Sequence, residues 1–156
     1  MHAFTYGNET NTCSFHDLQK VISEGNSVKL QLNCHFNTNE IITKSMSIDL
    51  NGYNLKCTGG YRLIIAADKW LALKNICGTG KFSGRISFSD TDCILKIHSS
   101  EVLARDFSVD KNGVPGVIEI GDGYSDIIQT LSVLQTNINV KKVIVKRGAK
   151  LIIING

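Results

Sequence analysis

Carboxylates and arginines are the residues of this 156-residue chain whose types could support catalysis. Two carboxylates about 5–9.5 Å apart can hydrolyse a glycosidic bond, and a carboxylate cluster can hold Ca²⁺. The candidates for such a set are Asp49, Asp90, Asp92, Asp106 and Asp110, with Arg85 or Arg105. Arg105 and Asp106 are neighbours on one expected strand, so their side chains point to opposite faces and do not form a pair. We therefore lean towards surface charges and turn aspartates, and against catalysis, without excluding an enzyme.

Three aromatic residues offer a second kind of site. Tyr53, Tyr61 and Trp70 lie on or between neighbouring expected strands and could stack against sugar rings. A glycan-binding site built on them would comprise Tyr53, Tyr61, Trp70, Asp90, Asp92 and Arg105. The alternative is that these aromatics cover an edge of the hydrophobic core.

The segment 141–150 (KKVIVKRGAK) is strongly basic. It holds five of the 17 Lys and Arg residues and no acid: Lys141, Lys142, Lys146, Arg147 and Lys150. These residues either keep an exposed strand soluble or bind an anionic partner. The segment contains no aromatic residue, so a nucleic acid is an unlikely ligand.

Composition and cysteine usage narrow the class of protein. Hydrophobic residues make up 42% of the chain and charged residues 20%, and no apolar run approaches the ~18 residues of a membrane span. The cysteines are odd in number and form no C-x-x-C pair: Cys13, Cys34, Cys57, Cys77 and Cys93. The start has no signal-peptide pattern. We expect no cofactor and no metal, and reduced cysteines in a cytoplasmic or virion-associated protein, although a fragment of a secreted chain stays possible.

One helix and many strands are expected. Ser14 can cap a short helix over about 14–24, which Gly25 ends, after an N-terminal extension over 1–13. From residue 28 to the end, short β-branched runs alternate with Gly, Asn and Asp turns. We expect a single domain over 1–156.

The strands carry a recurring motif in which an apolar–x–apolar run ends in asparagine. It occurs at 30–33 (LQLN), 48–51 (IDLN), 71–75 (LALKN) and 152–155 (IIIN). Asparagine tolerates left-handed turns, and its amide can hydrogen-bond to the next coil. The separation of 18 residues between Asn33 and Asn51 and of 24 between Asn51 and Asn75 is typical of one coil of a parallel β-helix. A β-sandwich is the alternative.

Segments 14–36 and 46–57 resemble the opening of right-handed parallel β-helix proteins of the pectate-lyase-like superfamily. The residues that carry the resemblance are Gly25, Val28 and Leu30, then Ile48, Asp49, Asn51, Gly52 and Leu55. Segment 143–156 resembles the coils of adhesin-like β-helices. The resemblance implies an all-β, right-handed parallel β-helix (β-solenoid) with a capping helix. The D-D, G-H-G and R-I-K motifs of the family's galacturonan hydrolases are absent, which favours a non-enzymatic member.

The function expected from these observations is non-catalytic binding of a macromolecule. A lateral face or the C-terminal end would engage a protein partner or another copy of the chain. Such a protein would suit a phage, as a virion component or as an inhibitor of a host factor. The alternative is a carbohydrate-binding or carbohydrate-active module of a spike, an adhesin or a lyase-like protein.

Overall fold

A computed structural model describes residues 4–6, 9–12, 15–25, 27–36, 38–57, 61–75, 77, 80–98, 101–109, 114–121, 129–134 and 140–154. These residues form one helix and a long series of short strands. In chain order they are β1 (Phe4–Tyr6), β2 (Glu9–Thr12), α1 (Phe15–Glu24), β3 (Ser27–Leu30), β4 (Cys34–Phe36), β5 (Glu40–Ile42), β6 (Met46–Asp49), β7 (Asn54–Cys57), β8 (Arg62–Ile65), β9 (Trp70–Lys74), β10 (Lys81–Phe88), β11 (Ile94–His98), β12 (Glu101–Val109), β13 (Val117–Ile120), β14 (Gln129–Leu134), β15 (Lys142–Val145) and β16 (Ala149–Ile154).

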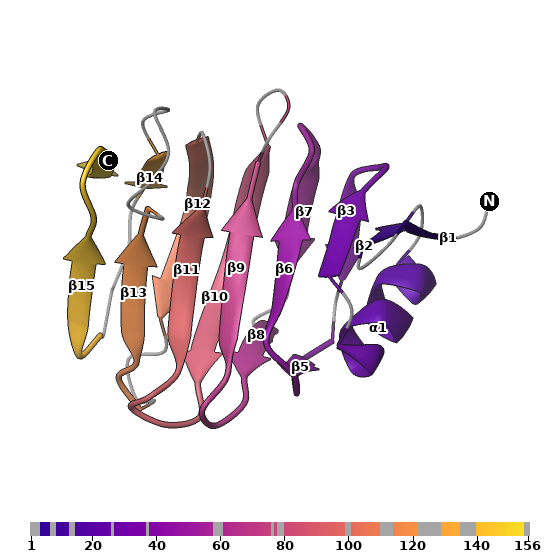
Figure 1. The fold of residues 1–156 in the computed structure, drawn as a ribbon, viewed down its shortest axis with the longest axis horizontal. Helices are drawn as coiled ribbons and strands as arrows, with labels where there is room; N and C mark the ends of the chain where they lie inside the picture. Colours follow the sequence, from indigo (N-terminus) through magenta and orange to yellow (C-terminus); the bar gives the residue numbers. More distant parts are fainter. Residues whose placement is uncertain are drawn as a thin grey trace.

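The strands wind into a parallel β-solenoid. The first sheet has the order β1-β2-β3-β6-β9-β11-β13-β15, and the second has the order β16-β14-β12-β10-β7-β4, with β5 and β8 beside β10. Every described pairing between named strands is parallel except that of β1 with β2, and an isolated antiparallel bridge joins Phe88 to Val114. In Figure 1 the near strands run upward and the chain returns behind them while it advances from right to left, which is right-handed winding. The expected right-handed parallel β-helix is confirmed.

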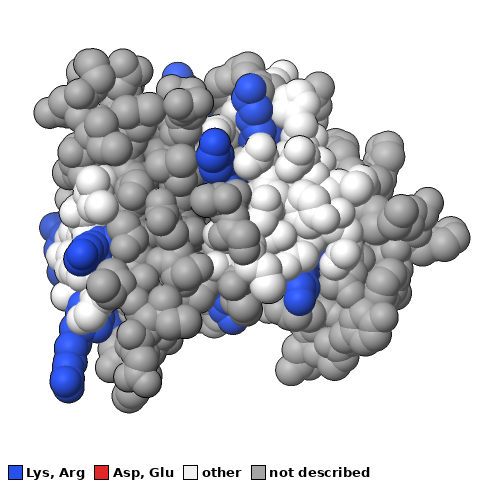
Figure 2. Space-filling model, turned by 90° about the horizontal axis from the view of Figure 1, so that it is seen from above, with Lys and Arg blue, Asp and Glu red and all other residues white. Residues whose placement is uncertain are grey.

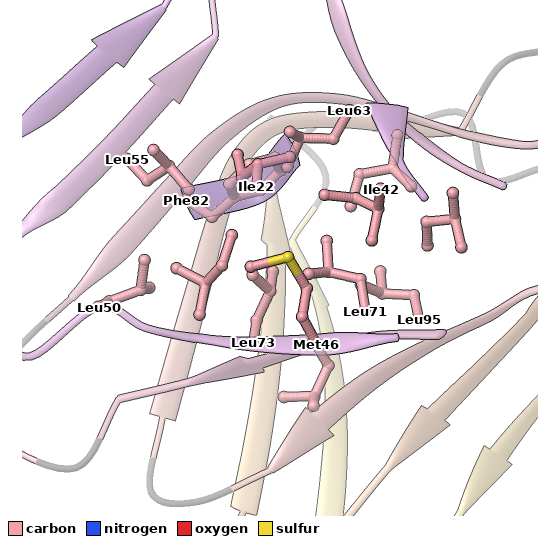
Figure 3. Packing of buried hydrophobic residues seen from close by; sticks show 14 of the residues in the cluster. Ile22, Ile42, Met46, Leu50, Leu55, Leu63, Leu71, Leu73, Phe82 and Leu95 are labelled. Carbon is pink, nitrogen blue, oxygen red and sulfur yellow. The ribbon is translucent and has the colours of Figure 1, made fainter. Parts of the chain in front are cut away.

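Stacked apolar columns form the core. Along the first sheet, Val28, Ile48, Leu73, Ile97 and Ile120 stand in register on successive coils, and each is at most 1% exposed. Figure 3 shows the core side chains that meet between the two sheets. Because strand side chains alternate between faces, the apolar–x–apolar motif supplies two such columns per sheet.

The asparagines of the repeated motif tie each coil to the next. Asn51 adopts a left-handed φ of 51°, and its Nδ2 donates to the Leu30 carbonyl at 3.0 Å. The Asn75 Oδ1 accepts from the Gly52 N–H at 2.9 Å. These bonds cross between coils and satisfy backbone groups at the turn, where no strand partner is present.

The second sheet bends at Gly84. The first half of β10 pairs with β7 and its second half with β8, and the register shifts between Ser83 and Arg85. Gly84 has a φ of 140°, and a Cβ there would lie 2.8 Å from the Cys57 Cβ. Glycine is therefore required at this corner by conformation and by space.

Helix α1 closes the N-terminal end of the solenoid, as expected. Val21 is 3% exposed and Ile22 is 1% exposed, and the helix packs against β2, β3, β4 and β5. Figure 3 places Ile22 among the core side chains. The segment expected as an N-terminal extension contributes β1 and β2, which add to the first sheet beyond β3. No helix in the described part of the chain is long and apolar enough to cross a membrane.

Candidate partner-binding surface

The coil made by β15 and β16 forms the other end of the solenoid, and we call residues 140–152 the terminal coil. β15 pairs with β13 in the first sheet, and β16 pairs with β14 in the second. Neither strand has a second neighbour among the strands that the structure describes. Each therefore presents one edge of backbone N–H and C=O groups that no described strand covers.

The interior columns end on exposed side chains in this coil. Val145 stands in register with Ile120, which is fully buried, yet Val145 is 47% exposed. Val143 continues the column of Ile118 and is only partly buried. On β16, Ile152 is 42% exposed, but it follows Leu151, which packs against the core, so Ile152 points outward. Val145 is therefore an exposed residue at a core position of this coil.

The basic residues predicted as a binding site all lie on the terminal coil. Lys141, Lys142, Arg147 and Lys150 are exposed, and Lys146 is partly exposed. The Lys146 Nζ lies 3.0 Å from the Glu119 Oε1, an ion pair that joins the terminal coil to β13. No acidic residue occurs between 140 and 152, so the coil presents positive charge beside its exposed apolar side chains.

Basic side chains also lie on one face of the rest of the solenoid. Figure 2 shows Lys and Arg side chains, and no Asp or Glu among the described residues, on the face seen from above. The turn at the end of β15 adds to it, because Gly148 adopts a φ of 78° and the Ala149 N–H donates to the Lys146 carbonyl at 2.9 Å. This tight turn holds Arg147 at its exposed tip.

The predicted glycan-binding residues do not share one surface. Trp70 begins β9, whereas Tyr53 follows the end of β6, so the two lie at opposite ends of the first sheet's strands. Tyr61 precedes β8 and is 41% exposed, and Tyr53 packs partly against the core. The Lys96 Nζ lies 4.5 Å from the centre of the Trp70 ring and occupies one of its faces. The side chain of Arg105, on β12, lies outside the described ones.

Asp90 and Asp92 do meet, together with an aspartate that the sequence analysis missed. One ligand atom from each of Asp68, Asp90 and Asp92 lies within 4.8 Å of the others. Carboxylate oxygens are ligands of Ca²⁺ and Mg²⁺, so these are the described residues that could hold a cation. The signal for Asp68 was its position one coil before Asp90, at the equivalent turn.

The Asp90 carboxylate also accepts several hydrogen bonds at this turn. Its Oδ1 accepts from the Asp92 N–H at 3.0 Å, the Asp68 N–H at 3.4 Å and the Cys93 Sγ at 3.3 Å. Desolvation raises the pKa of Asp90, but the hydrogen bonds from Cys93, Asp92 and Asp68 outweigh it and bring the pKa below its ordinary value. The carboxylate thus joins the turn that contains Asp68 to the turn that contains Asp92, and this structural role requires no bound ion.

The other candidate catalytic residues do not assemble. Asp49 is 1% exposed, and its Oδ1 accepts from the Asn51 N–H at 2.9 Å within the turn. Arg85 is exposed on β10 and stands in register with Arg62. Asp110 lies outside the described residues, as does the side chain of Asp106. Of the candidate catalytic residues that the structure describes, only Asp90 and Asp92 come together, in the cluster with Asp68.

Two of the buried thiols have a raised pKa. Desolvation and the nearby Glu40 carboxylate raise the pKa of Cys57 from 9.0 to about 11. Burial is also the main reason that the pKa of Cys93 is raised, although its bond to Asp90 enters with it. Cys34, Cys57 and Cys93 are buried, and Cys77 is exposed, so three of these four fill the core as small apolar side chains.

Comparison with known proteins adds no functional assignment: no family model matches the chain, and no curated protein or solved structure matches it either.

Proposed function

We propose that this protein is a non-catalytic binding module that holds a protein partner on its terminal coil. The observation that carries the proposal is the coincidence of an exposed core position and basic side chains in one coil. Val145 exposes apolar surface on β15, and Lys142, Arg147 and Lys150 are exposed on the same coil. Protein interfaces combine an apolar centre with a polar rim in this way.

The charge of the terminal coil indicates the chemistry of the partner. Five basic residues and no acid lie within about a dozen residues, so the complementary surface is acidic. A nucleic acid would also be anionic, but the coil offers no aromatic side chain for base stacking. The proposed partner is therefore a protein with an acidic surface that carries exposed apolar residues.

The carbohydrate-binding alternative has less support. Sugar platforms need an open aromatic face, and Lys96 covers one face of Trp70. Tyr53 follows β6, at the opposite end of the first sheet's strands from Trp70, and Tyr61 precedes β8, which belongs to the second sheet.

The narrower expectations remain proposals as well. They are kinship with the pectate-lyase-like superfamily, a phage origin, and a cytoplasmic or virion-associated location. A role as a host-factor inhibitor or virion component would use the same surface.

Site-specific photo-crosslinking tests the proposed function. The photoreactive residue p-benzoylphenylalanine replaces Val145 in one variant and Leu32 in a matched control. Leu32 is 43% exposed and lies between β3 and β4, far from the terminal coil. We expect a discrete protein adduct from position 145, in an extract of cells that produce the protein naturally, and none from position 32.

Charge reversal then asks whether the adduct depends on the basic residues. Lys141→Glu, Lys142→Glu and Arg147→Glu together should abolish the adduct, and salt should weaken it. Lys146 is left unchanged because it pairs with Glu119. Equal adducts from positions 145 and 32, or an adduct that survives charge reversal, would overturn the proposal.

A further inference from the structure

We infer that the partner binds by strand addition, with an extended acidic segment pairing along the open edge of β15. This inference rests on the proposed function and specifies the binding mode and the sequence pattern of the ligand. The edge of β15 is the one that does not pair with β13. Extended peptides bind such edges through main-chain hydrogen bonds, while side chains provide selectivity.

The first sheet defines what a further strand must look like. From β3 to β15 every new strand joins in parallel and continues two interior columns of apolar side chains. The columns reach Val143 and Val145 in β15, and Val145 is the interior residue left 47% exposed. A strand placed against this edge would cover Val145 and remove its apolar surface from water.

The outward positions of β15 are different. Lys142 is in register with Val117 and Ile144 with Glu119, so Lys142 and Ile144 point outward, as does Lys146 next in the alternation. Lys142 is exposed on this face of the edge, whereas Lys146 already pairs with Glu119 on β13. Side chains directly opposite each other on neighbouring strands interact, and opposite charges are favourable. The ligand that fits therefore alternates apolar residues, over Val143 and Val145, with acidic residues, one of which lies beside Lys142.

A second copy of the chain fits this edge poorly. Two terminal coils that meet edge to edge would bring Lys142 and Lys146 of one copy against the same residues of the other, and like charges opposite each other are destabilising. Stacking end to end meets a different obstacle, because α1 packs across β3, β4 and β5 at the other end. Charge complementarity thus selects an acidic segment of another protein.

Fluorescence anisotropy with synthetic peptides tests strand addition directly. The probe is a fluorescein-labelled octapeptide of alternating Glu and Val, used where the peptide alone shows no rise in anisotropy. One comparison peptide alternates Lys and Val. A second keeps the Glu–Val sequence but carries N-methyl groups at every other residue, which removes the N–H donors from one edge and leaves the charge unchanged.

We expect the Glu–Val peptide to bind, and the Lys–Val and N-methylated peptides to bind at least about fivefold more weakly. Lys142→Glu and Val145→Asp should each weaken the Glu–Val peptide by a similar factor. Lys20→Glu is the matched control, because Lys20 is an exposed lysine of α1 at the far end of the solenoid. It should leave binding unchanged.

Three other outcomes would contradict the inference. If the N-methylated peptide binds as tightly as the parent while Lys142→Glu weakens both, charge alone is at work, and strand addition is wrong although the proposed function stands. Failure of every acidic peptide, with the crosslinked adduct at position 145 still present, has the same meaning. If light scattering shows a dimer that the Glu–Val peptide does not dissociate, the occupant of the edge is a second copy and the inference is overturned.

Discussion

The two ends of the solenoid differ in how well their outermost core positions are covered. Any β-solenoid has a first and a last coil whose core side and strand edges lack a neighbour. At the N-terminal end, α1 lies over the opening and buries Ile22 to 1% exposure. At the terminal coil, Val145 occupies the same kind of core position and stays 47% exposed. Helix α1 covers the first end, and no strand of the described part of the chain covers the second.

The outer strand edges of the first sheet also differ between the two ends. In the first sheet, the short hairpin of β1 and β2 covers the edge of β3. The edge of β15 has no such cover in the described part of the chain, and it is flanked by lysines instead. Lysines at an edge hinder pairing with identical chains, and they favour an acidic partner. The same lysines would therefore both discourage self-association and favour the acidic partner proposed above.

Truncation of one side chain at each end should give the largest contrast. Ile22→Ala removes buried side-chain atoms beneath the helix, and we expect the free energy of unfolding to fall by about 2–5 kcal/mol. Val145→Ala removes a side chain that is already half exposed, and the loss should be about 1 kcal/mol or less. Urea denaturation followed by circular dichroism measures both. Equal losses for the two variants would show that the terminal coil is as closed as the N-terminal end.

Two glycines provide the next contrast, between the interior corner and the terminal turn. Gly84→Ala places a Cβ 2.8 Å from the Cys57 Cβ at a φ of 140°, and should destabilise the protein by about 2–3 kcal/mol. Gly148→Ala forces alanine to a φ of 78° in the exposed turn after β15, at a cost of about 1–2 kcal/mol. Thermal unfolding should rank Gly84→Ala below Gly148→Ala. The reverse order would argue that the terminal turn is the tighter of the two.

Features that depend on residues close together in the sequence could be predicted better than contacts between residues far apart in the sequence. Local patterns predicted the helix, because its expected cap at Ser14 and its stop at Gly25 lie within a dozen residues of each other. The repeated asparagines predicted stacked coils, because each coil returns to the same turn. The basic terminal segment was equally visible, since Lys141 and Lys142 begin an unbroken run.

Contacts between coils were harder to predict. Asp68 joins Asp90 across 22 residues, and Lys96 reaches Trp70 from the next coil, and both depend on a register that composition does not fix. The bend at Gly84 was also missed, because a glycine in a strand run signals only that some irregularity is present. The separation of Tyr53 from Trp70 follows from the same register: residues near in sequence end up at opposite ends of the strands.

Alkaline pH should destabilise the protein through the buried thiol of Cys57. Burial raises the pKa of Cys57 to about 11, from 9.0 in the unfolded chain, so above pH 9 the unfolded state loses this proton first. The unfolded state then binds fewer protons, and stability falls as pH rises between 9 and 11. Urea titrations across this range should show a shallower decline for Cys57→Ala than for the parent. Cys77→Ala, at an exposed thiol, is the control and should follow the parent.

An ion pair also joins the terminal coil to the rest of the solenoid. Glu119 and Lys146 form an ion pair at 3.0 Å, with side chains 15% and 36% exposed, so water screens much of their attraction. A double-mutant cycle with Glu119→Gln and Lys146→Gln should give a coupling of about 0.2–1 kcal/mol that declines with salt. A larger coupling would mean that the terminal coil is held by charge. A small one would leave backbone pairing with β13 and β14 as its main support.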